Sequence, residues 1–109
     1  MIVWESGNRP VANLVIHFAA EAEYEVALAW YLNRSQRAAT RFMAAFEAAC
    51  FAITTMPEAS PICDAIHRRR QLKRYPYGIV YRVESEQILI VAMPHDRQLP
   101  GYWDGRASP

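Results

Sequence analysis

The stretch that decides the fold is Leu72-Lys73-Arg74-Tyr75-Pro76-Tyr77-Gly78-Ile79-Val80-Tyr81-Arg82-Val83, followed after a polar turn by Ile88-Leu89-Ile90-Val91-Ala92-Met93. The β-branched and aromatic residues in these runs predict strands over residues 78–84 and 87–93. The link between them is short and polar, so we expect the two strands to pair as an antiparallel hairpin. Residues 88–91 are apolar without alternation, which places their strand centrally, with both faces covered. A further strand is predicted over residues 66–75.

Two helices are predicted towards the N-terminus. Over residues 19–33 apolar side chains recur at helical spacing and define one face: Ala20, Tyr24, Ala27, Leu28 and Tyr31. A second helix is predicted from a Ser35 cap to about Met56, and Pro57 ends it. Only Asn33 and Arg34 separate the two helices, so we expect them to fold back as a hairpin.

The short, β-prone run Leu14-Val15-Ile16-His17-Phe18 adds a first strand. The predicted order is therefore strand, helix, helix, strand, strand, strand, an α+β fold with a helical hairpin packed on a small, mostly antiparallel sheet. A chain of 109 residues fits one domain. We expect that domain over residues 14–106, with an N-terminal arm at 1–13 and a C-terminal tail at 107–109.

Charge is distributed unevenly along the chain. The formal net charge is +1, yet acidic residues cluster at 21–25 and basic residues at 68–74. Local fields therefore matter more than net charge. The two cysteines, Cys50 and Cys63, lie in unrelated contexts and no Cys/His cluster has metal-ligand spacing, so we expect no metal, no cofactor and free thiols. No secretory signal or membrane span is apparent, which predicts a cytoplasmic protein.

The basic run is the main candidate binding element. Strand alternation places Arg70, Leu72 and Arg74 on one face, with Arg69, Gln71 and Lys73 on the other. Charge on an edge strand can simply prevent aggregation. Cations on two faces exceed that need, so we interpret the run as a surface that binds phosphates or an acidic protein.

The phrase Leu72-Lys73-Arg74-Tyr75-Pro76-Tyr77, the following Ile79-Val80-Tyr81-Arg82, and the endings His95-Asp96-Arg97 and Pro100-Gly101-Tyr102-Trp103 resemble the RelE/ParE toxin superfamily over about residues 14–106. The resemblance implies a growth-inhibiting toxin of a type II toxin–antitoxin (plasmid stabilisation) system. Its partner would be a ParD-like or similar antitoxin, held in a hetero-oligomer. RelE-like members cut mRNA on the ribosome, whereas ParE-like members inhibit DNA gyrase by binding.

Gly78 places the sequence nearer to the ParE-like branch. RelE-like toxins commonly carry an arginine at this position, and a glycine cannot stabilise the phosphorane of RNA cleavage. We therefore expect a gyrase-binding toxin with no catalytic residues rather than an enzyme. The alternative is a ribosome-dependent endoribonuclease that uses Arg74, His95, Arg97 and Tyr102. A further alternative is a decayed toxin that only binds antitoxin.

The expected contact residues fall into two overlapping sets. Those expected to bind the target are Arg69, Arg70, Lys73, Arg74, Arg97 and Tyr102. Those expected to bind the antitoxin are Trp30, Arg37, Arg41, Arg70 and Arg74. His95 can also serve structurally by closing the end of the sheet, Trp103 by packing over it, and Arg97 by pairing with Asp96 or Asp104.

Overall fold

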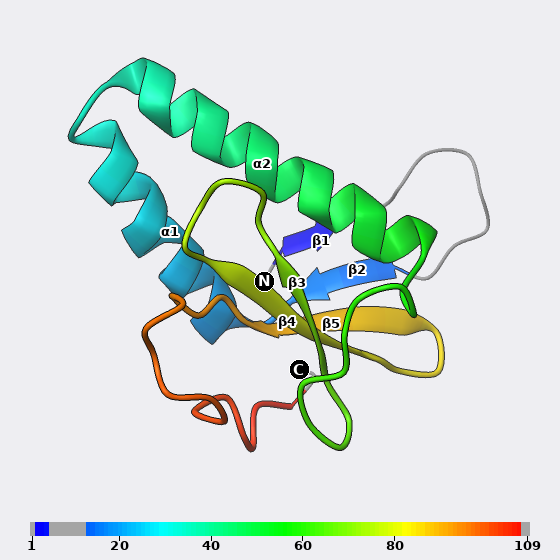
Figure 1. The fold of residues 1–109 in the computed structure, drawn as a ribbon. Coiled ribbons are helices and arrows are strands. Elements are labelled where there is room, and N and C mark those ends of the chain that lie inside the picture. Colours follow the sequence, from blue (N-terminus) through cyan, green and yellow to red (C-terminus); the bar gives the residue numbers. More distant parts are fainter. Residues whose placement is uncertain (1, 5–12, 108–109) are drawn as a thin grey trace.

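The protein is described by a computed structural model that covers residues 2–4 and 13–107 (Figure 1). Its elements are β1 (Ile2–Trp4), β2 (Asn13–Ile16), α1 (Phe18–Leu32), α2 (Gln36–Thr55), β3 (Arg68–Gln71), β4 (Gly78–Val83) and β5 (Gln87–Ala92). From β2 onwards this is the predicted order, so the α+β fold is confirmed. Strand β1 falls within the segment expected to be an arm. Residues 5–12 of that arm, and 108–109 of the expected tail, lie outside the described residues.

One sheet carries all five strands, in the order β1-β2-β5-β4-β3. The pairs β1–β2, β3–β4 and β4–β5 are antiparallel, and β2–β5 is parallel. Strand β5 is central, as predicted, because Leu14 and Val83 flank Ile88 from either side. The predicted turn closes through the Glu84 N–H, which donates to the Gln87 carbonyl at 2.7 Å.

The two faces of the sheet are covered by different parts of the chain. Both helices lie above it in Figure 1, over a core that includes Phe42, Ile79 and Tyr81. Residues 93–107, which we call the C-terminal segment, cross the lower face. There Trp103 is buried against side chains of β2 and β4 such as Val15 and Val80. The expected packing role of Trp103 is thereby confirmed. Tyr24, Leu28 and Tyr31 pack against the helix-side core, also as predicted.

The ends of the helices follow local chemistry. The Ser35 hydroxyl accepts from the Ala38 N–H at 2.9 Å, so the predicted cap of α2 is confirmed. Helix α1, which has no strong predicted cap, uses His17, whose Nδ1 accepts from the Ala19 N–H at 3.0 Å. Within residues 2–4 and 13–107, neither helix is both long and apolar enough to span a membrane.

Strand β3 is much shorter than the predicted strand over residues 66–75. The chain leaves the sheet after Gln71 and turns back, with the Leu72 N–H donating to the Tyr77 carbonyl and Arg74 in the left-handed region at a φ of 71°. Alternation consequently stops before Lys73. Its predicted place beside Arg69 is wrong, because Lys73 lines the same groove as Arg70 and Arg74, whereas Arg69 does not.

Candidate functional site

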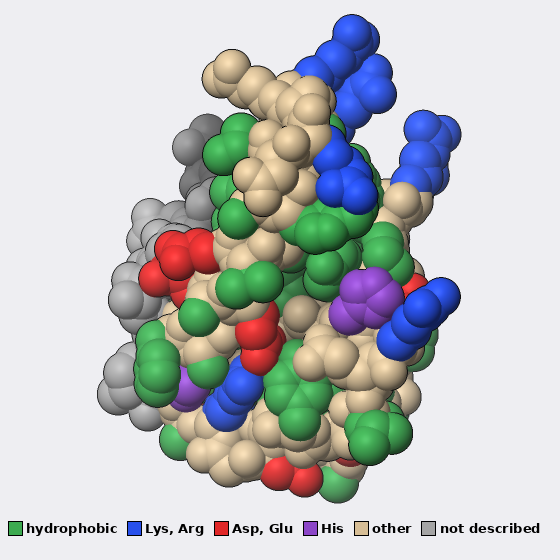
Figure 2. Space-filling model, turned by 90° about the vertical axis from the view of Figure 1, so that its left-hand side faces the viewer, with side chains coloured by type: hydrophobic (Ala, Val, Ile, Leu, Met, Phe, Trp, Pro, Cys, Tyr) green, Lys and Arg blue, Asp and Glu red, His purple; other side chains and the backbone are tan. Residues whose placement is uncertain are grey.

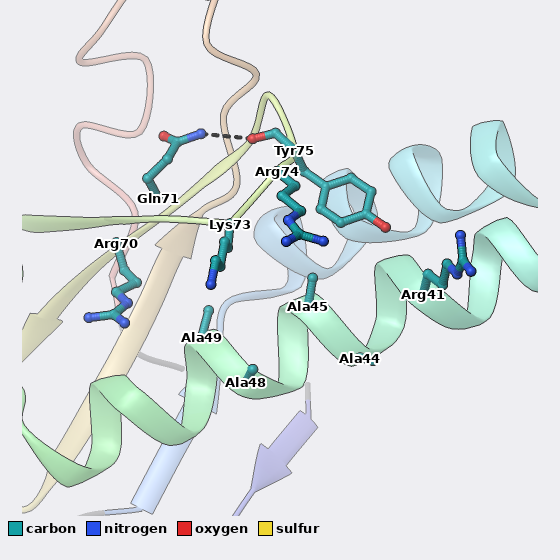
Figure 3. Close-up of a pocket in the computed structure, with 10 residues that line it drawn as sticks. All are labelled: Arg41, Ala44, Ala45, Ala48, Ala49, Arg70, Gln71, Lys73, Arg74 and Tyr75. Atoms are coloured by element: carbon teal, nitrogen blue, oxygen red, sulfur yellow. Dashed lines mark hydrogen bonds between the residues drawn. The ribbon is translucent and has the colours of Figure 1, made fainter.

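A groove of about 860 Å³ lies between α2 and residues 70–75, which comprise the end of β3 and the start of the β3–β4 connection (Figure 3). We call it the cationic groove. Its lining residues are Arg41, Ala44, Ala45, Ala48 and Ala49 from α2, Arg70 and Gln71 from the end of β3, and Lys73, Arg74 and Tyr75 from the β3–β4 connection. In Figure 3 the alanines form one wall along the helix and the basic side chains surround the space between the two elements.

The alanine wall follows from the spacing of α2. Positions 44, 45, 48 and 49 lie on adjacent turns of one helix face, because residues three and four apart are neighbours. Ala49 is buried, while Ala44 and Ala48 are exposed. Methyl side chains keep this wall low, so another backbone can come close to the helix.

The groove concentrates uncompensated positive charge. Arg41, Arg70, Lys73 and Arg74 border it, and among the residues that the structure describes none of those lining it is acidic. None of these four takes part in the salt bridges found among the described residues. Cations gathered along a concave surface raise the local concentration of anionic partners. The charge of the groove is therefore complementary to carboxylates or phosphates.

The turn that carries Lys73 and Arg74 is anchored by its neighbour Tyr75. The Tyr75 ring packs edge-on against Tyr31 and Phe42, each at a centroid distance of 5.3 Å. Its carbonyl accepts from the Gln71 side-chain amide at 2.9 Å, the dashed bond in Figure 3. A left-handed arginine costs conformational energy, so these anchors are what hold the turn in shape.

The remaining expected antitoxin contacts extend the cationic surface towards the helical turn. Trp30 is 49% exposed, as its place off the apolar stripe predicts, and the Arg34 guanidinium lies 3.4 Å from its ring centroid. Arg37 is exposed one turn before Arg41 on α2. Figure 2 shows Lys and Arg side chains projecting at the top of the molecule, the end at which α1 turns into α2 in Figure 1.

On the opposite face of the sheet, the side chain of Arg69 lies over Gly78. Arg69 pairs with Val80, and so lies on the C-terminal-segment side of the sheet. A Cβ added at Gly78 would stand 2.4 Å from Arg69 Nε, because that side chain lies across the glycine. A guanidinium from the neighbouring strand therefore lies over the position at which the sequence itself has only a glycine. The Arg69 guanidinium is compensated, however, because Nη2 is 2.8 Å from Asp96 Oδ1.

The alternative catalytic residues do not form one site. Arg74 lies in the cationic groove, whereas Tyr102 packs on the other face of the sheet. The Tyr102 hydroxyl donates to Glu23 Oε1 at 3.1 Å, and burial together with the Glu23 charge raises the pKa of Tyr102. His95 Nδ1 accepts from the Arg97 N–H, and its ring packs edge-on against Tyr77.

The target-binding set is divided in the same way. Arg70, Lys73 and Arg74 meet in the cationic groove, while Arg69 and Tyr102 belong to the opposite face. Arg97 is exposed. Its suggested partner Asp96 pairs instead with Arg69.

Three features of this region are not among those predicted from the sequence: the alanine wall, Gln71 and Glu23. The Ala44-Ala45 and Ala48-Ala49 pairs are visible in the sequence as a repeated small-residue step on one helix face. The residues next to Gln71 and Glu23 in the sequence do not indicate which groups these two side chains bind. Gln71 joins the turn to Asp96, and Glu23 accepts from both the Met93 N–H and the Tyr102 hydroxyl, partners that are distant in sequence.

Fold and groove together define a small α+β protein whose concave surface suits an extended anionic segment of another macromolecule. A family model of the ParE toxin of type II toxin–antitoxin systems (parDE) matches residues 14–100. The chain belongs to this toxin family, which implies a cognate antitoxin as its partner. No curated protein matches the chain.

Proposed function

We propose that this chain is a ParE-like toxin that acts in the cytoplasm by binding DNA gyrase, and that a cognate antitoxin silences it by occupying the cationic groove. The observation that carries the proposal, beside membership of the toxin family, is the set of four cations without salt-bridge partners around an alanine wall. The two proteins would form a hetero-oligomer and act together as a toxin–antitoxin system of the plasmid-stabilisation type.

The groove favours an amphipathic, acidic antitoxin segment. Small apolar side chains can pack on Ala44 and Ala48, while carboxylates face Arg41, Arg70 and Arg74. A segment that continues past the end of the groove would reach Arg37 and Trp30 at the helical turn. Arg70 and Arg74 are also expected to bind the target, so an antitoxin in the groove would exclude gyrase directly.

Three features support binding over catalysis. The Tyr102 hydroxyl is engaged by Glu23, the Arg69 charge is compensated by Asp96, and Arg74 lies on the far side of the sheet from Tyr102. General acid–base chemistry needs its groups around one scissile bond. A protein that inhibits by binding needs only a complementary surface.

Gyrase supercoiling assays with the purified, folded chain test this proposal. We expect loss of supercoiling and accumulation of cleaved DNA complexes, both reversed by the cognate antitoxin. An Arg70→Glu/Arg74→Glu variant provides the matched comparison and should inhibit less. Absence of inhibition and of cleavage complexes with folded protein would reject the gyrase target.

A ribosome-dependent endoribonuclease is the second candidate, and the Arg69 guanidinium across Gly78 is the observation that favours it. Mapping of mRNA 5′ ends after induction distinguishes the two. Cuts within translated frames that disappear in Arg97→Ala or Tyr102→Phe would establish the nuclease. Unimpaired growth after induction without antitoxin would instead identify a decayed toxin.

A further inference from the structure

We propose that Arg69, Gln71 and Asp96 are positioning residues for the cationic groove, although Arg69 and Asp96 lie outside it and only Gln71 borders it. This inference rests on the proposed binding role of the groove. The three side chains hold residues 72–77, the turn that supplies Lys73, Arg74 and Tyr75 to the groove wall. Neither Arg69 nor Asp96 needs to touch the partner in order to control its affinity.

The three side chains form a closed hydrogen-bonded network. Arg69 Nη2 donates to Asp96 Oδ1 at 2.8 Å and to Gln71 Oε1 at 3.3 Å. The Gln71 side-chain amide donates to Asp96 Oδ1 at 3.0 Å. The Arg69 and Asp96 side chains are 26% and 46% exposed, so water competes only in part for these bonds.

The network is tied to the turn at two points. The Gln71 amide also donates to the Tyr75 carbonyl, next to the left-handed Arg74. The Asp96 N–H donates to the Pro76 carbonyl at 2.8 Å. A strained turn persists only when its surroundings determine its shape, and the network supplies that constraint from outside the groove.

Gly78 makes the network possible. Its φ does not lie in the left-handed region, so the backbone itself accepts an alanine. The added Cβ would meet Arg69 Nε at 2.4 Å and Cζ at 2.8 Å, and the flexible arginine would have to leave. Gly78→Ala therefore displaces Arg69 while changing no polar atom of the network, which makes it the sharpest test.

The first experiment uses the free, full-length chain and needs no partner. Amide exchange measured by NMR at Leu72 and Asp96 reports the bonds that close the turn and join it to residue 96. We expect exchange to accelerate about tenfold or more in Gly78→Ala and Arg69→Ala, with the amides of α2 unchanged. Arg82→Ala is the matched control, because it removes another ion pair on the same face, that with Glu84.

Unchanged exchange in both network variants would overturn the proposal, as would equal acceleration in the Arg82→Ala control. If Arg69→Ala or Gly78→Ala accelerates exchange throughout α2, the variant has loosened the whole fold and does not test the network. Asp96→Asn is then the test variant, because it preserves the side-chain volume and removes only the carboxylate charge. Selective acceleration at Leu72 then supports the proposal, and its absence rejects it.

The second experiment measures binding of a labelled ten-residue polyglutamate peptide by fluorescence anisotropy. We expect Gly78→Ala to weaken salt-dependent binding about threefold to tenfold, and the double variant Gly78→Ala/Arg69→Ala to bind no more weakly than Gly78→Ala alone. Loosened exchange with unchanged peptide affinity would overturn the positioning role. If the unaltered chain does not bind the peptide, the proposed binding of acidic segments by the groove is contradicted. The exchange experiment still tests whether Arg69, Gln71 and Asp96 hold the turn.

Discussion

Arg69 lies across Gly78, so closely that a Cβ on the glycine would stand 2.4 Å from the arginine Nε. The two residues sit on neighbouring strands, where Gly78 pairs with Gln71 and Arg69 with Val80. The glycine thus provides the space in which the cation reaches Asp96. In the sequence, Gly78 indicates that a positive charge is absent from this position. In the structure, the guanidinium of Arg69, from the neighbouring strand, lies there.

Reversing charge in the cationic groove should weaken antitoxin binding. We expect Arg70→Glu and Arg74→Glu each to reduce affinity for the cognate antitoxin at least about tenfold, because they replace attraction by repulsion at a concave surface. Calorimetric titration at two salt concentrations measures the effect. Arg82→Gln, on the other face of the sheet, should leave affinity unchanged, and an equal loss there would show that the groove is not the binding surface.

Filling the alanine wall should block the groove without unfolding the protein. Ala48 is exposed on α2, and leucine is nearly as good a helix former as alanine, so Ala48→Leu should fold normally. Its side chain would project into the space that a partner backbone needs, and we expect antitoxin affinity to fall about tenfold. Binding titrations, paired with circular dichroism, check both statements.

The exposed Ala29 of α1 offers a matched control for that substitution, since it does not line the groove. Ala29→Leu should bind antitoxin as the unaltered chain does. Equal affinities for the Ala48→Leu and Ala29→Leu variants would argue that the partner bypasses the alanine wall.

The left-handed Arg74 predicts an inverted order of stabilities. Glycine tolerates a φ of 71°, whereas alanine does not, so Arg74→Gly should be more stable than Arg74→Ala by about 1 kcal/mol. In an ordinary turn or helix the alanine variant would be at least as stable. Urea denaturation of the two variants, which lack the same charge, measures the difference directly. A more stable Arg74→Ala would mean that residues 72–77 adopt another conformation in solution.

The features that could be predicted from the sequence have local causes. Ser35 and Pro57 mark the ends of α2 through their own backbone chemistry, and the turn before Gln87 follows from a short polar link. The sequence locates the basic run but not the placement of its side chains, of which Lys73 and Arg74 are exposed and Arg68, Arg69 and Arg70 are half-buried. Lys73 changes side because Arg74 turns the chain, and alternation carries no information about where a strand ends.

Contacts between distant residues could not be predicted. Nothing near Gly78 in the sequence indicates that Arg69 covers it, or that Asp96 compensates the charge, since these relations depend on strand register and on the path of residues 94–97. The groove lies between α2 and a turn about twenty-five residues later in the chain. Its alanine wall is visible in the sequence only once the position of the facing turn is known.

The lowered pKa of Asp64 predicts how the free energy of unfolding changes between neutral and acidic pH. Burial would raise the pKa of this carboxyl, but hydrogen bonds from the Ile66 N–H, the Trp103 indole and His67 outweigh it and lower the pKa from 3.8 to about 2. A lowered folded-state pKa contributes stability above pH 3.8, and that contribution is lost as the pH falls towards 2. Asp64→Asn should therefore cost about 1–2 kcal/mol at pH 7 and flatten the loss of stability between these pH values. Urea unfolding followed by tryptophan fluorescence from pH 2 to 7 provides the curves.

The Glu23 carboxylate joins α1 to Met93, Tyr102 and Arg106 through three interactions, and so contributes to holding residues 102–106 in place. Oε1 accepts from the Met93 N–H at 2.8 Å and the Tyr102 hydroxyl at 3.1 Å, while Oε2 pairs with Arg106 at 2.9 Å. Glu23→Gln keeps the volume but loses the charge, so it should destabilise the chain by about 1–2 kcal/mol. Tyr102→Phe removes only one of the three bonds and should cost less. Thermal unfolding of both variants tests this order, and an equal or larger loss for Tyr102→Phe would place the principal fastening at the tyrosine ring instead.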